Sequence, residues 1–314
     1  MTTRQHHRRR NAGTAPVAAD ALSRVLSAFF AVVLVAGVCL VSYPTVSDWW
    51  NRMHQSRAVA SYIEQTEDLS AVQRQTMLDA AQAYNRRLAQ RDDRGRWTMT
   101  DAERAEYDSL LDVSGTGVMG YVTIPRIAVR LPIYHGTDEG VLQIAVGHLA
   151  GSSLPVGGAD THAVVSGHTG LPSAKLLTGL DRLREGDTFA FHVLGETLTY
   201  QVDRIDVVLP DELDVLGIEP GRDYATLVTC TPYGVNSHRL LVRGHRIPTP
   251  AEPDDVDYAA PVALMGLAIG AGAGALLAAA AVAAWRLTRR RPRCRGAHIS
   301  GAHITQEHHM HEER

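Results

Sequence analysis

Thr-Leu-Val-Thr-Cys-Thr-Pro-Tyr-Gly, residues 226–234, decides how the chain is interpreted, because an apolar run of the β type ends there at Cys230. Arg239 follows nine residues later in Asn-Ser-His-Arg-Leu-Leu-Val-Arg, where a second β-type run begins. A thiol at the end of one strand and a guanidinium on the next supply a nucleophile and a fixed cationic hydrogen-bond donor at one place. These two groups are suited to acyl transfer.

A histidine upstream offers a third group. Ala-Val-Val-Ser-Gly-His-Thr-Gly-Leu-Pro ends a strand-like run and places His168 in a glycine-flanked loop, a common position for functional side chains on a rigid scaffold. Taken alone, Cys230 could be a buried, inert core cysteine. Its combination with His168 and Arg239 favours a catalytic thiol.

From about residue 117 to residue 246 the chain resembles the sortases, transpeptidases of Gram-positive cell surfaces. The matching segments occur in the family's order: Gly-Tyr-Val-Thr-Ile-Pro-Arg-Ile, Leu-Pro-Ile-Tyr-His-Gly, Gly-His-Leu-Ala-Gly-Ser-Ser-Leu-Pro-Val-Gly-Gly, Ser-Gly-His-Thr-Gly-Leu-Pro-Ser-Ala-Lys and Thr-Cys-Thr-Pro-Tyr-Gly-Val-Asn-Ser-His-Arg. Within the family they are similar to class C, the pilin-polymerising branch. The resemblance implies a mainly β fold, a closed sortase-type β-barrel with short helices, and the catalytic residues Cys230, His168 and Arg239.

The resemblance also implies a reaction. Cys230 would attack the Thr carbonyl of a Leu-Pro-x-Thr-Gly-like sorting signal, and His168 would protonate the departing glycine amine. Arg239 would hold the substrate carbonyl or the developing oxyanion. An acceptor lysine of the next pilin subunit would then resolve the acyl-enzyme as an isopeptide bond. We expect no cofactor and no metal.

Other functions stay open. A cell-wall-anchoring sortase would use the same residues with a peptidoglycan-precursor amine, but a helical extension before the barrel favours pilin polymerisation. A non-catalytic surface barrel that binds peptides or scaffolds pilus assembly is a second alternative. A papain-like protease is disfavoured because His168 precedes Cys230 and the pattern around both is β-rich. A formal net charge of −3 over 314 residues gives no charge basis for nucleic-acid binding.

Two long apolar segments, residues 25–43 and 259–285, carry no charged residue and are long enough to cross a bilayer core of about 30 Å as helices. Arginines cluster before the first (residues 4–10) and after the second (residues 286–295), so the positive-inside rule places both termini in the cytoplasm. The first segment could instead be a signal peptide, although no Ala-x-Ala-like site is clear. A lipoprotein site at Cys39 is disfavoured by the preceding valine.

Small residues in the second apolar segment, Gly266, Gly270 and Gly274, have four-residue spacing, which permits close helix approach in lipid. Pairing with the first segment is one interpretation, and an ordinary Ala/Gly-rich anchor is the preferred one. Cys39 lies in the first predicted span and Cys294 in the basic tail. Cys230 is therefore the single cysteine of the predicted exterior region, where no internal disulfide can form.

The pattern along the chain predicts its organisation. We expect a cytoplasmic N-terminus (1–24), a transmembrane helix (25–43), an extracytoplasmic helical extension with a lid loop (44–112), a catalytic barrel (113–249), a linker (250–258), a transmembrane helix (259–285) and a basic, His-rich cytoplasmic tail (286–314). The tail histidines could bind a metal, but a disordered extension is preferred because no partners complete a closed site.

Within the exterior region, three-to-four spacing of apolar residues predicts helix from about residue 48 to 107, with capping residues at Thr100-Asp-Ala-Glu. Residues 172–180 predict a short helix opened by a proline. Period-two alternation predicts strands near residues 118–125, 162–166, 187–193, 197–208, 225–230 and 238–243.

Class C sortases usually carry an Asp-Pro-aromatic lid motif before the barrel. The corresponding region here has Asp92, Asp93 and Trp97 without that proline. We expect a lid that uses Asp93 and Trp97, with a charged turn and a packing aromatic as the alternative. Thr229 is a candidate for a hydroxyl near the nucleophile, or a plain strand threonine.

Several polar residues compete with the three candidates. His148 follows a glycine but lacks the Ser-Gly-His-x-Gly-Leu-Pro context, so we interpret it as structural. His238 should face away from Arg239 by strand alternation. We expect His245 at a barrel end, and sequence context favours Arg239 over Arg243.

Overall fold

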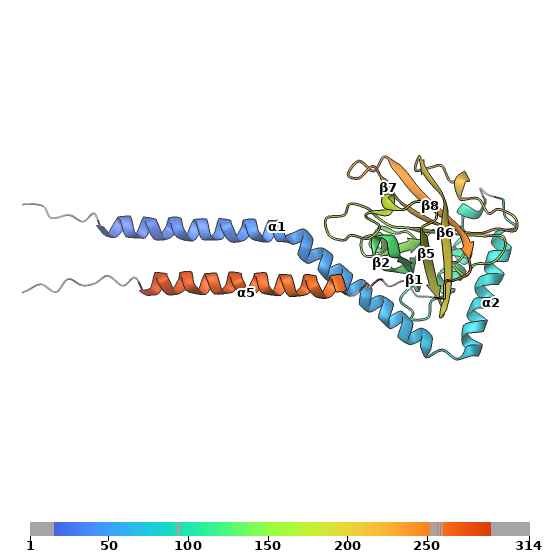
Figure 1. Ribbon diagram of the computed structural model, residues 1–314, viewed down its shortest axis with the longest axis horizontal. Helices are drawn as coiled ribbons and strands as arrows, with labels where there is room; N and C mark the ends of the chain where they lie inside the picture. Colours follow the sequence, from blue (N-terminus) through green and yellow to red (C-terminus); the bar gives the residue numbers. More distant parts are fainter. Residues whose placement is uncertain (1–15, 93–94, 252–255, 257, 259, 290–314) are drawn as a thin grey trace, which may run out of the picture. The chain divides into compact units, whose positions relative to one another are not determined.

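The structure, a computed structural model, describes residues 16–92, 95–251, 256, 258 and 260–289. The chain divides into two units, and the boundary lies between Gly266 and Leu267, within helix α5 (Ala260–Arg289). The first unit contains helix α1 and the strands β1 to β8 (Figure 1). It is this unit that carries the predicted catalytic residues.

Eight strands form a closed barrel in the order β1-β2-β3-β4-β7-β8-β6-β5. Their bounds are β1 Val118–Ile124, β2 Val129–His135, β3 Val146–His148, β4 Thr161–Ser166, β5 Thr188–Val193, β6 Glu196–Val208, β7 Asp223–Thr231 and β8 His238–Ile247. The β2–β3 and β4–β7 pairs are parallel, and the other neighbours are antiparallel. The closed β-barrel expected from the sequence is confirmed.

One tight hairpin sets the register of β5 and β6. Leu194 and Gly195 connect the strands and both have positive φ, 50° and 84°, as a two-residue hairpin turn requires. Val193 therefore pairs with Glu196, and the ladder continues to Thr188 opposite Gln201. The turn fixes which face of each strand is buried.

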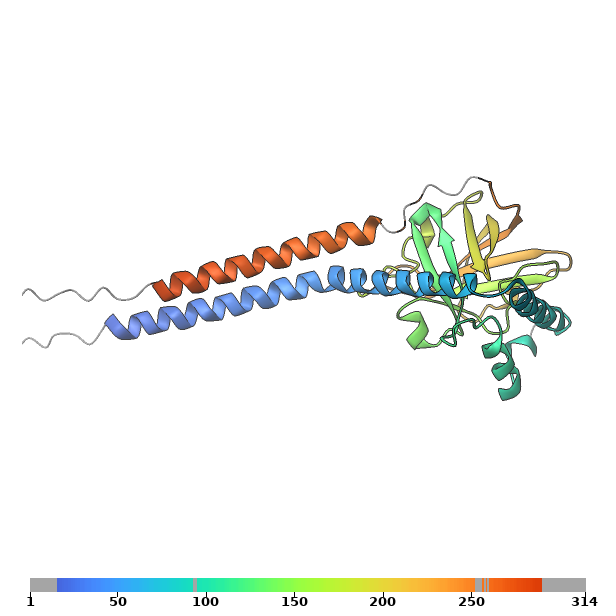
Figure 2. The ribbon, with the colours of Figure 1, turned by 90° about the horizontal axis from the view of Figure 1, so that it is seen from below.

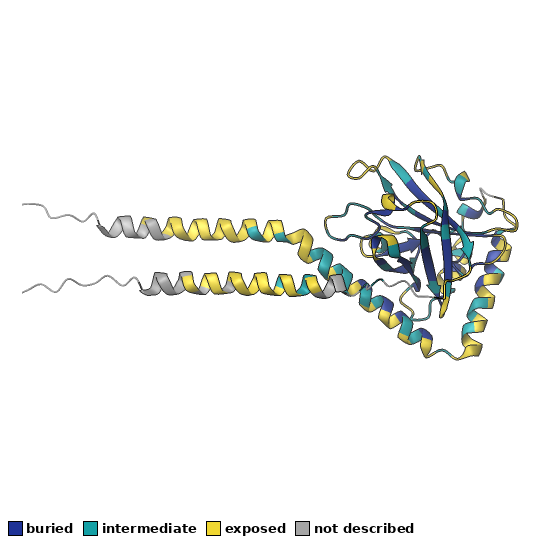
Figure 3. Cartoon of the chain, in the orientation of Figure 1, coloured by how far each residue is buried: buried dark blue, intermediate teal, exposed yellow. Residues whose placement is uncertain are grey.

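The interior of the barrel is apolar. Phe189, Phe191 and Tyr200 are at most 1% exposed, and their ring centroids lie 5.7–5.8 Å apart. Other fully buried members of the same core are Val122, Ile124, Ile133, Leu227 and Val242. Burial of each large side chain contributes about 1.5–3 kcal/mol. Figure 3 shows the strands as the most buried part of the chain.

Helices precede the barrel as the sequence predicts. They are α1 Pro16–Glu67, α2 Ala71–Leu88, the 3-10 helix η1 Gly95–Trp97 and α3 Asp101–Ser109. Reciprocal capping boxes, Ser70 with Gln73 and Thr100 with Glu103, begin α2 and α3. Each cap satisfies backbone N–H groups that a helix start leaves unpaired. Short elements within the barrel are η2 Pro125–Ile127, α4 Glu139–Leu142, η3 Leu180–Arg182 and η4 Asp214–Leu216.

The extension packs on the barrel through buried polar contacts. Tyr62 of α1 donates its hydroxyl to Met119 O at 3.0 Å and accepts from Leu194 N at 2.9 Å. Asn85 of α2 donates to Leu154 O at 3.0 Å and accepts from Leu154 N at 2.7 Å. These bonds hold the C-terminal part of α1, and α2, against the strands, an arrangement that Figure 2 shows from a second side.

The N-terminal part of α1 differs from the rest of the first unit. From Val25 onward its large apolar side chains are exposed, as the colours of Figure 3 show. Among the described residues, the stretch Val25–Glu67 is the one helix that is long and apolar enough to cross a membrane. This is consistent with membrane anchoring at the N-terminal end. The second predicted span falls in α5, whose apolar stretch Leu264–Ala280 is shorter, and it stays a prediction.

Three local expectations were wrong or incomplete. The sequence did not predict β2, which contains Pro132, or β3, which has three residues. Residues 172–179 form turns and a short bridge instead of the predicted helix, and the 3-10 helix η3 begins only at Leu180. Leu176 has a φ of +39°, and a bridge joins Leu171 to Ala174. Asp48 of α1 also accepts the Lys175 N–H at 2.7 Å, so a tertiary contact competes with the helical bond.

Candidate active site

Cys230 and Arg239 lie directly opposite each other on neighbouring antiparallel strands. The register pairs Cys230 of β7 with Arg239 of β8 and, two residues further in, Val228 with Leu241. Side chains of directly opposed residues share a face of the sheet, with Cβ atoms about 5 Å apart. Both Cys230 and Arg239 are half-buried. The strand pair expected from the sequence therefore brings thiol and guanidinium together.

His168 reaches the same place because β4 runs parallel to β7. The parallel ladder ends with Ser166 opposite Val228, and it continues beyond the strand through Gly167 N, which donates to Val228 O at 3.0 Å. Thr229 Oγ1 donates to Gly167 O at 2.7 Å. The next residue of the loop is His168, so its side chain emerges beside the end of β7.

One cavity of about 280 Å³ is lined by Cys230, His168 and Arg239. Its walls are mainly apolar: Leu142, Leu149, Val208, Leu209, Pro210, Leu213, Leu216, Val228 and Leu241. Thr137, Ser166, Glu212 and Thr229 supply the polar lining. The three residues that the sequence analysis singled out thus share one depression with a low-polarity surround.

Arg239 keeps its guanidinium in place through backbone carbonyls. Its Nη1 donates to His238 O at 3.1 Å and to Asn236 O at 3.3 Å. Within the described part of the chain, no carboxylate forms an ion pair with Arg239. A guanidinium has five N–H donors, so several stay available to a substrate oxygen.

Arg243 has a different environment. Its guanidinium lies 3.1 Å from Asp203 and 3.2 Å from Glu219, and it sits 4.1 Å from the centre of the Tyr224 ring. Burial lowers the pKa of Arg243, but the hydrogen bond that it donates to Asp203 and the nearby negative charges outweigh burial, so the pKa is raised. Arg243 does not line the cavity of Cys230. The choice of Arg239 over Arg243 agrees with this geometry.

Two histidines that could be confused with His168 are structural. His148 is fully buried, and its ring contacts Tyr107 Oη at 2.9 Å and Ser153 O at 2.8 Å. His162 is 1% exposed and contacts Gly217 O and Thr226 Oγ1. His168, in contrast, is half-buried at the cavity wall.

The remaining competitors also lie outside the cavity. His238 contacts Ser237 Oγ at 2.9 Å and pairs with Thr231 in the ladder. His245 lies 3.6 Å from Asp203 near the other end of β8. Neither lines the site of Cys230.

The candidate binding residue Thr229 lines the cavity, whereas the candidate lid residue Trp97 does not. Thr229 lines the cavity, but its side chain is buried and its hydroxyl donates to Gly167 O, so it holds the His168 loop to β7. Trp97 does not line the cavity and packs behind its wall, against a cluster built on Val164, Leu216 and Leu241. Asp93 lies outside the described residues, as do Cys294 and the histidines of the tail.

Sequence reasoning missed the wall opposite the nucleophile. Residues 208–216 are the end of β6 with the loop and η4 that follow, and they line the cavity with the carboxylate of Glu212 and five apolar residues, Val208, Leu209, Pro210, Leu213 and Leu216. No motif marks this segment. Its alternation of apolar and polar residues after β6 was the only available signal.

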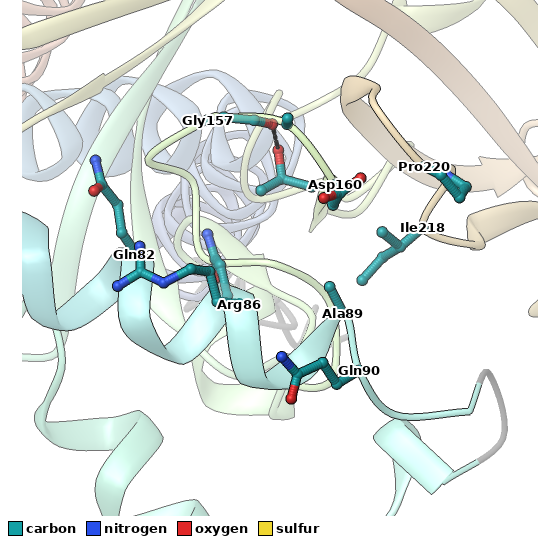
Figure 4. Close-up of a pocket in the computed structure, with 12 residues that line it drawn as sticks. Gln82, Arg86, Ala89, Gln90, Gly157, Asp160, Ile218 and Pro220 are labelled. Carbon is teal, nitrogen blue, oxygen red and sulfur yellow. Dashed lines mark hydrogen bonds between the residues drawn. The ribbon is translucent and has the colours of Figure 1, made fainter.

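A larger cavity of about 710 Å³ lies elsewhere in the first unit (Figure 4). Gln82 and Arg86 of α2, with Ala89 and Gln90 directly after it, face Gly157 and Asp160, and Ile218 and Pro220 also line the cavity. It adjoins the beginning of β4 and β7, whereas Cys230 lies at the end of β7. It is larger than the cavity of Cys230, and none of its lining residues is a cysteine. Among the described residues, no group of three or more His, Cys, Asp or Glu side chains is placed to hold a metal ion.

Comparison with known proteins identifies this arrangement. Residues 122–247, which run from β1 to the end of β8, match the family model of the sortase domain. The solved structure of sortase C1 from Streptococcus agalactiae is 49% identical, with a TM-score of 0.59, over 62% of this chain and 100% of that one. The chain belongs to the sortase family. Sortases are cysteine transpeptidases.

Other relatives agree. Streptococcus pneumoniae sortase C is 42% identical with a TM-score of 0.56, over 63% of this chain and 100% of that one. Sortase C-1 from Actinomyces oris is 48% identical with a TM-score of 0.52, over 56% and 99%. Sortase A from Streptococcus agalactiae is 30% identical over 117 residues, 36% of this chain, and the chain spans about half of that curated relative, 47%. The structural neighbours thus favour class C, as the motifs predict.

The buried histidines predict a pH dependence of stability. Burial lowers the pKa of both His148 and His162 to about 4. Histidine in the unfolded chain titrates near about 6.5, so between these values the unfolded state binds more protons. The free energy of unfolding should therefore fall as the pH falls from about 6.5 to about 4, by up to about 3 kcal/mol for each histidine. Denaturant unfolding at several pH values measures this.

Carboxylates titrate in part of the same window, so a variant must isolate the histidine effect. His148→Gln removes one of three histidines whose pKa burial lowers to about 4, the third being His192, so its free energy of unfolding should depend less steeply on pH between about 6.5 and 4 than that of the wild type. An identical slope in both proteins would contradict the assignment of His148 as a neutral buried group.

Proposed function

We propose that the chain is a membrane-anchored cysteine transpeptidase that cleaves a Leu-Pro-x-Thr-Gly-like signal between Thr and Gly and joins pilin subunits through a lysine isopeptide bond. The observation that carries this proposal is the convergence of Cys230, His168 and Arg239 on one cavity from three strands. A nucleophile, a proton carrier and a cationic donor are the parts that acyl transfer requires.

In the proposed reaction, the Cys230 thiolate attacks the carbonyl carbon of the substrate threonine and forms a tetrahedral intermediate. Arg239 donates hydrogen bonds to the oxyanion that develops there. The C–N bond to glycine breaks as His168 gives its proton to the leaving amine, which leaves a thioester on Cys230. His168 then accepts a proton from the attacking lysine amine, and the new amide bond releases the thiol.

The cavity wall supports a substrate with apolar residues before the scissile bond. Leu149, Leu213 and Leu216 line the same space as Cys230. Leucine and proline side chains of a sorting signal would bury apolar area there, at roughly 25 cal/mol for each Å² removed from water. The low polarity also strengthens the interaction of Arg239 with an oxyanion.

Pilin subunits as partners are supported by likeness to class C enzymes. A structure of Streptococcus pneumoniae sortase C was described as giving insight into pilin substrate specificity. A sortase C1 of pilus island 1 of group B streptococci is 43% identical, with a TM-score of 0.58. The alternative acceptor is a peptidoglycan-precursor amine, which would make this a cell-wall-anchoring sortase.

The proposed localisation is the cell membrane. We infer two spans, residues 25–43 and 259–285, with both termini in the cytoplasm and residues 44–258 outside. The apolar, exposed part of α1 supports the first span. An ordinary Ala/Gly-rich anchor is the preferred interpretation of the second span, and pairing of the spans through Gly266, Gly270 and Gly274 is the alternative.

The proposed reaction can be tested by mass spectrometry of the purified chain incubated with a Leu-Pro-x-Thr-Gly peptide, with and without a pilin fragment that carries lysine. We expect an acyl adduct on Cys230 that transfers to lysine, and no adduct with Cys230→Ala. An adduct that transfers only to a peptidoglycan-type amine would assign the anchoring function instead. Absence of any adduct would favour a non-catalytic binding barrel.

Arg239 and Arg243 form a matched pair for testing the oxyanion role. Arg239→Ala should lower kcat for peptide cleavage by about 10²-fold, because one preorganised donor to the oxyanion is lost. Alkylation of Cys230 by iodoacetamide should proceed at the wild-type rate, since the thiol itself stays in place. Arg243→Ala should leave cleavage unchanged, because that arginine is engaged by Asp203 and Glu219. Equal loss in both variants would refute the specific role of Arg239.

We propose that the segment around η1 acts as a lid, with Trp97 and Asp93 as its tentative anchors. Trp97 packs against the cluster of Val164, Leu216 and Leu241, of which Leu216 and Leu241 also line the cavity of Cys230. Arg96 is buried over the Trp97 ring, with 4.6 Å between guanidinium and ring centre, and donates to Leu216 O at 2.8 Å. A lid mutant of Streptococcus agalactiae sortase C1 is among the similar structures, 42% identical with a TM-score of 0.53.

If η1 restricts access, Trp97→Ala should speed alkylation of Cys230. Loss of about 1.4 kcal/mol of packing would correspond to about a tenfold faster rate. Met99→Ala is the matched control, because Met99 lies two residues further on but packs against the main barrel core. An unchanged rate in Trp97→Ala would remove the lid from the proposal and leave Trp97 as a packing residue.

A further inference from the structure

The loop that carries His168 is fastened to helix α1. Asn51 Nδ2 donates to Ser173 O at 2.8 Å, and Lys175 N donates to Asp48 Oδ1 at 2.7 Å. The two α1 residues lie three positions apart and therefore on the same face of the helix. Both bonds reach backbone atoms of the segment between His168 and η3, and both are partly buried.

Arg52 of the same helix orients the Asp48 carboxylate for this contact. Arg52, one turn further along, donates from Nε and places Nη2 2.9 and 2.8 Å from Asp48 Oδ2. Oδ1 is thereby left for the Lys175 N–H. The side chains of Asp48 and Arg52 are 17% and 24% exposed, so water competes weakly for the pair.

Ser173 and Lys175, the loop residues bound to α1, lie close in sequence to Leu177, whose backbone N–H binds the carbonyl of His168. Leu177 N donates to His168 O at 3.1 Å, and Gly170 N donates to Thr178 Oγ1 at 3.0 Å. Leu177 is buried, whereas residues 168–173 are half-buried or exposed. The position of the His168 backbone thus depends on where the returning segment, residues 173–177, is held.

We propose that Asp48 and Asn51 are positioning residues for His168. They fix the returning segment against α1, and the segment in turn fixes the carbonyl of His168 and the direction of its imidazole. This inference rests on the proposed function, in which His168 moves protons. Proton transfer needs the donor within hydrogen-bond reach of the leaving amine, so a shift of the loop would lower the rate more than it lowers substrate binding.

Helix α1 contains both the predicted first membrane span and the residues that bind the His168 loop. The same continuous helix α1 contains the exposed apolar stretch that begins at Val25 and, near its middle, Asp48 and Asn51. The part of α1 that follows the predicted membrane span contacts the catalytic loop through Asp48 and Asn51, and Pro44, which lacks a backbone N–H, lies inside the helix between the span and these residues.

The test compares variants of the full chain in detergent. Asp48→Ala combined with Asn51→Ala should lower kcat for peptide cleavage by about tenfold, with KM nearly unchanged, because general acid–base catalysis contributes about 10²-fold or more and tolerates little displacement. The pH profile of kcat should also shift. Asp48→Asn should restore most of the rate, since an amide oxygen can still accept the Lys175 N–H.

Gln55→Ala is the matched control. Gln55 lies on the same face of α1 and donates to Ile144 O at 2.7 Å, so its hydrogen bond fastens the helix to the barrel and not to the backbone of the His168 loop. We expect wild-type kcat for this variant. An equal loss in Gln55→Ala would mean that general docking of α1 matters, and it would overturn the positioning role.

A second measurement does not depend on catalysis. Hydrogen exchange of the amides of residues 168–178 should become faster in the Asp48→Ala and Asn51→Ala double variant and stay unchanged in Gln55→Ala. If exchange in this segment is unaffected, the inference is wrong whatever the activity. If the wild-type protein forms no Cys230 adduct, the proposed function is wrong. A changed exchange rate in the double variant would then still show that α1 holds the loop, but the loop would have no role in catalysis.

Discussion

The pairing of strand β7 with β4 on one side and β8 on the other is the constraint on which the site depends. Parallel pairing with β4 brings the loop after Ser166 to the end of β7, and antiparallel pairing with β8 brings the start of β8 to the same end. Cys230 is thereby flanked by Arg239, nine residues later in the chain, and by His168, which comes from a distant part of it. Closure of the barrel fixes all three strands, so the relative positions of the three groups follow from backbone hydrogen bonds.

The site also depends on which histidines and arginines have their polar atoms engaged by the protein and which stay accessible at the cavity. His148 and His162 are buried as neutral rings, each with hydrogen-bond partners that burial requires. His168 instead stays half-buried at a cavity wall, where it can exchange protons with a substrate. Arg243 is neutralised by two carboxylates, whereas Arg239 contacts only carbonyls among its hydrogen-bond partners in the described chain. The hydrogen-bond partners of each side chain thus distinguish the structural histidines and arginine from those at the candidate site.

Much of the fold and the central trio could be predicted from the sequence. Period-two alternation predicted six of the strands, and the ordered motifs predicted which cysteine, histidine and arginine converge. β2 and β3 could not be found in this way, because a proline interrupts one and the other is three residues long. The turns at residues 172–179 include Lys175, whose N–H binds Asp48, 127 positions away, and local propensity contains no information about such a contact.

The docking face of α1 explains why a distant helix can influence the catalytic loop. Asp48, Asn51, Gln55, Val59, Tyr62 and Thr66 recur at three- and four-residue spacing, the period of one helix face. The first three bind backbone atoms of the barrel, and the last three are at most 3% exposed. A helix held at so many points along one face transmits little bending between its turns. The membrane-side end of that face contacts the His168 loop and its far end contacts β1 through Tyr62, so the helix and the barrel behave as one rigid support for His168.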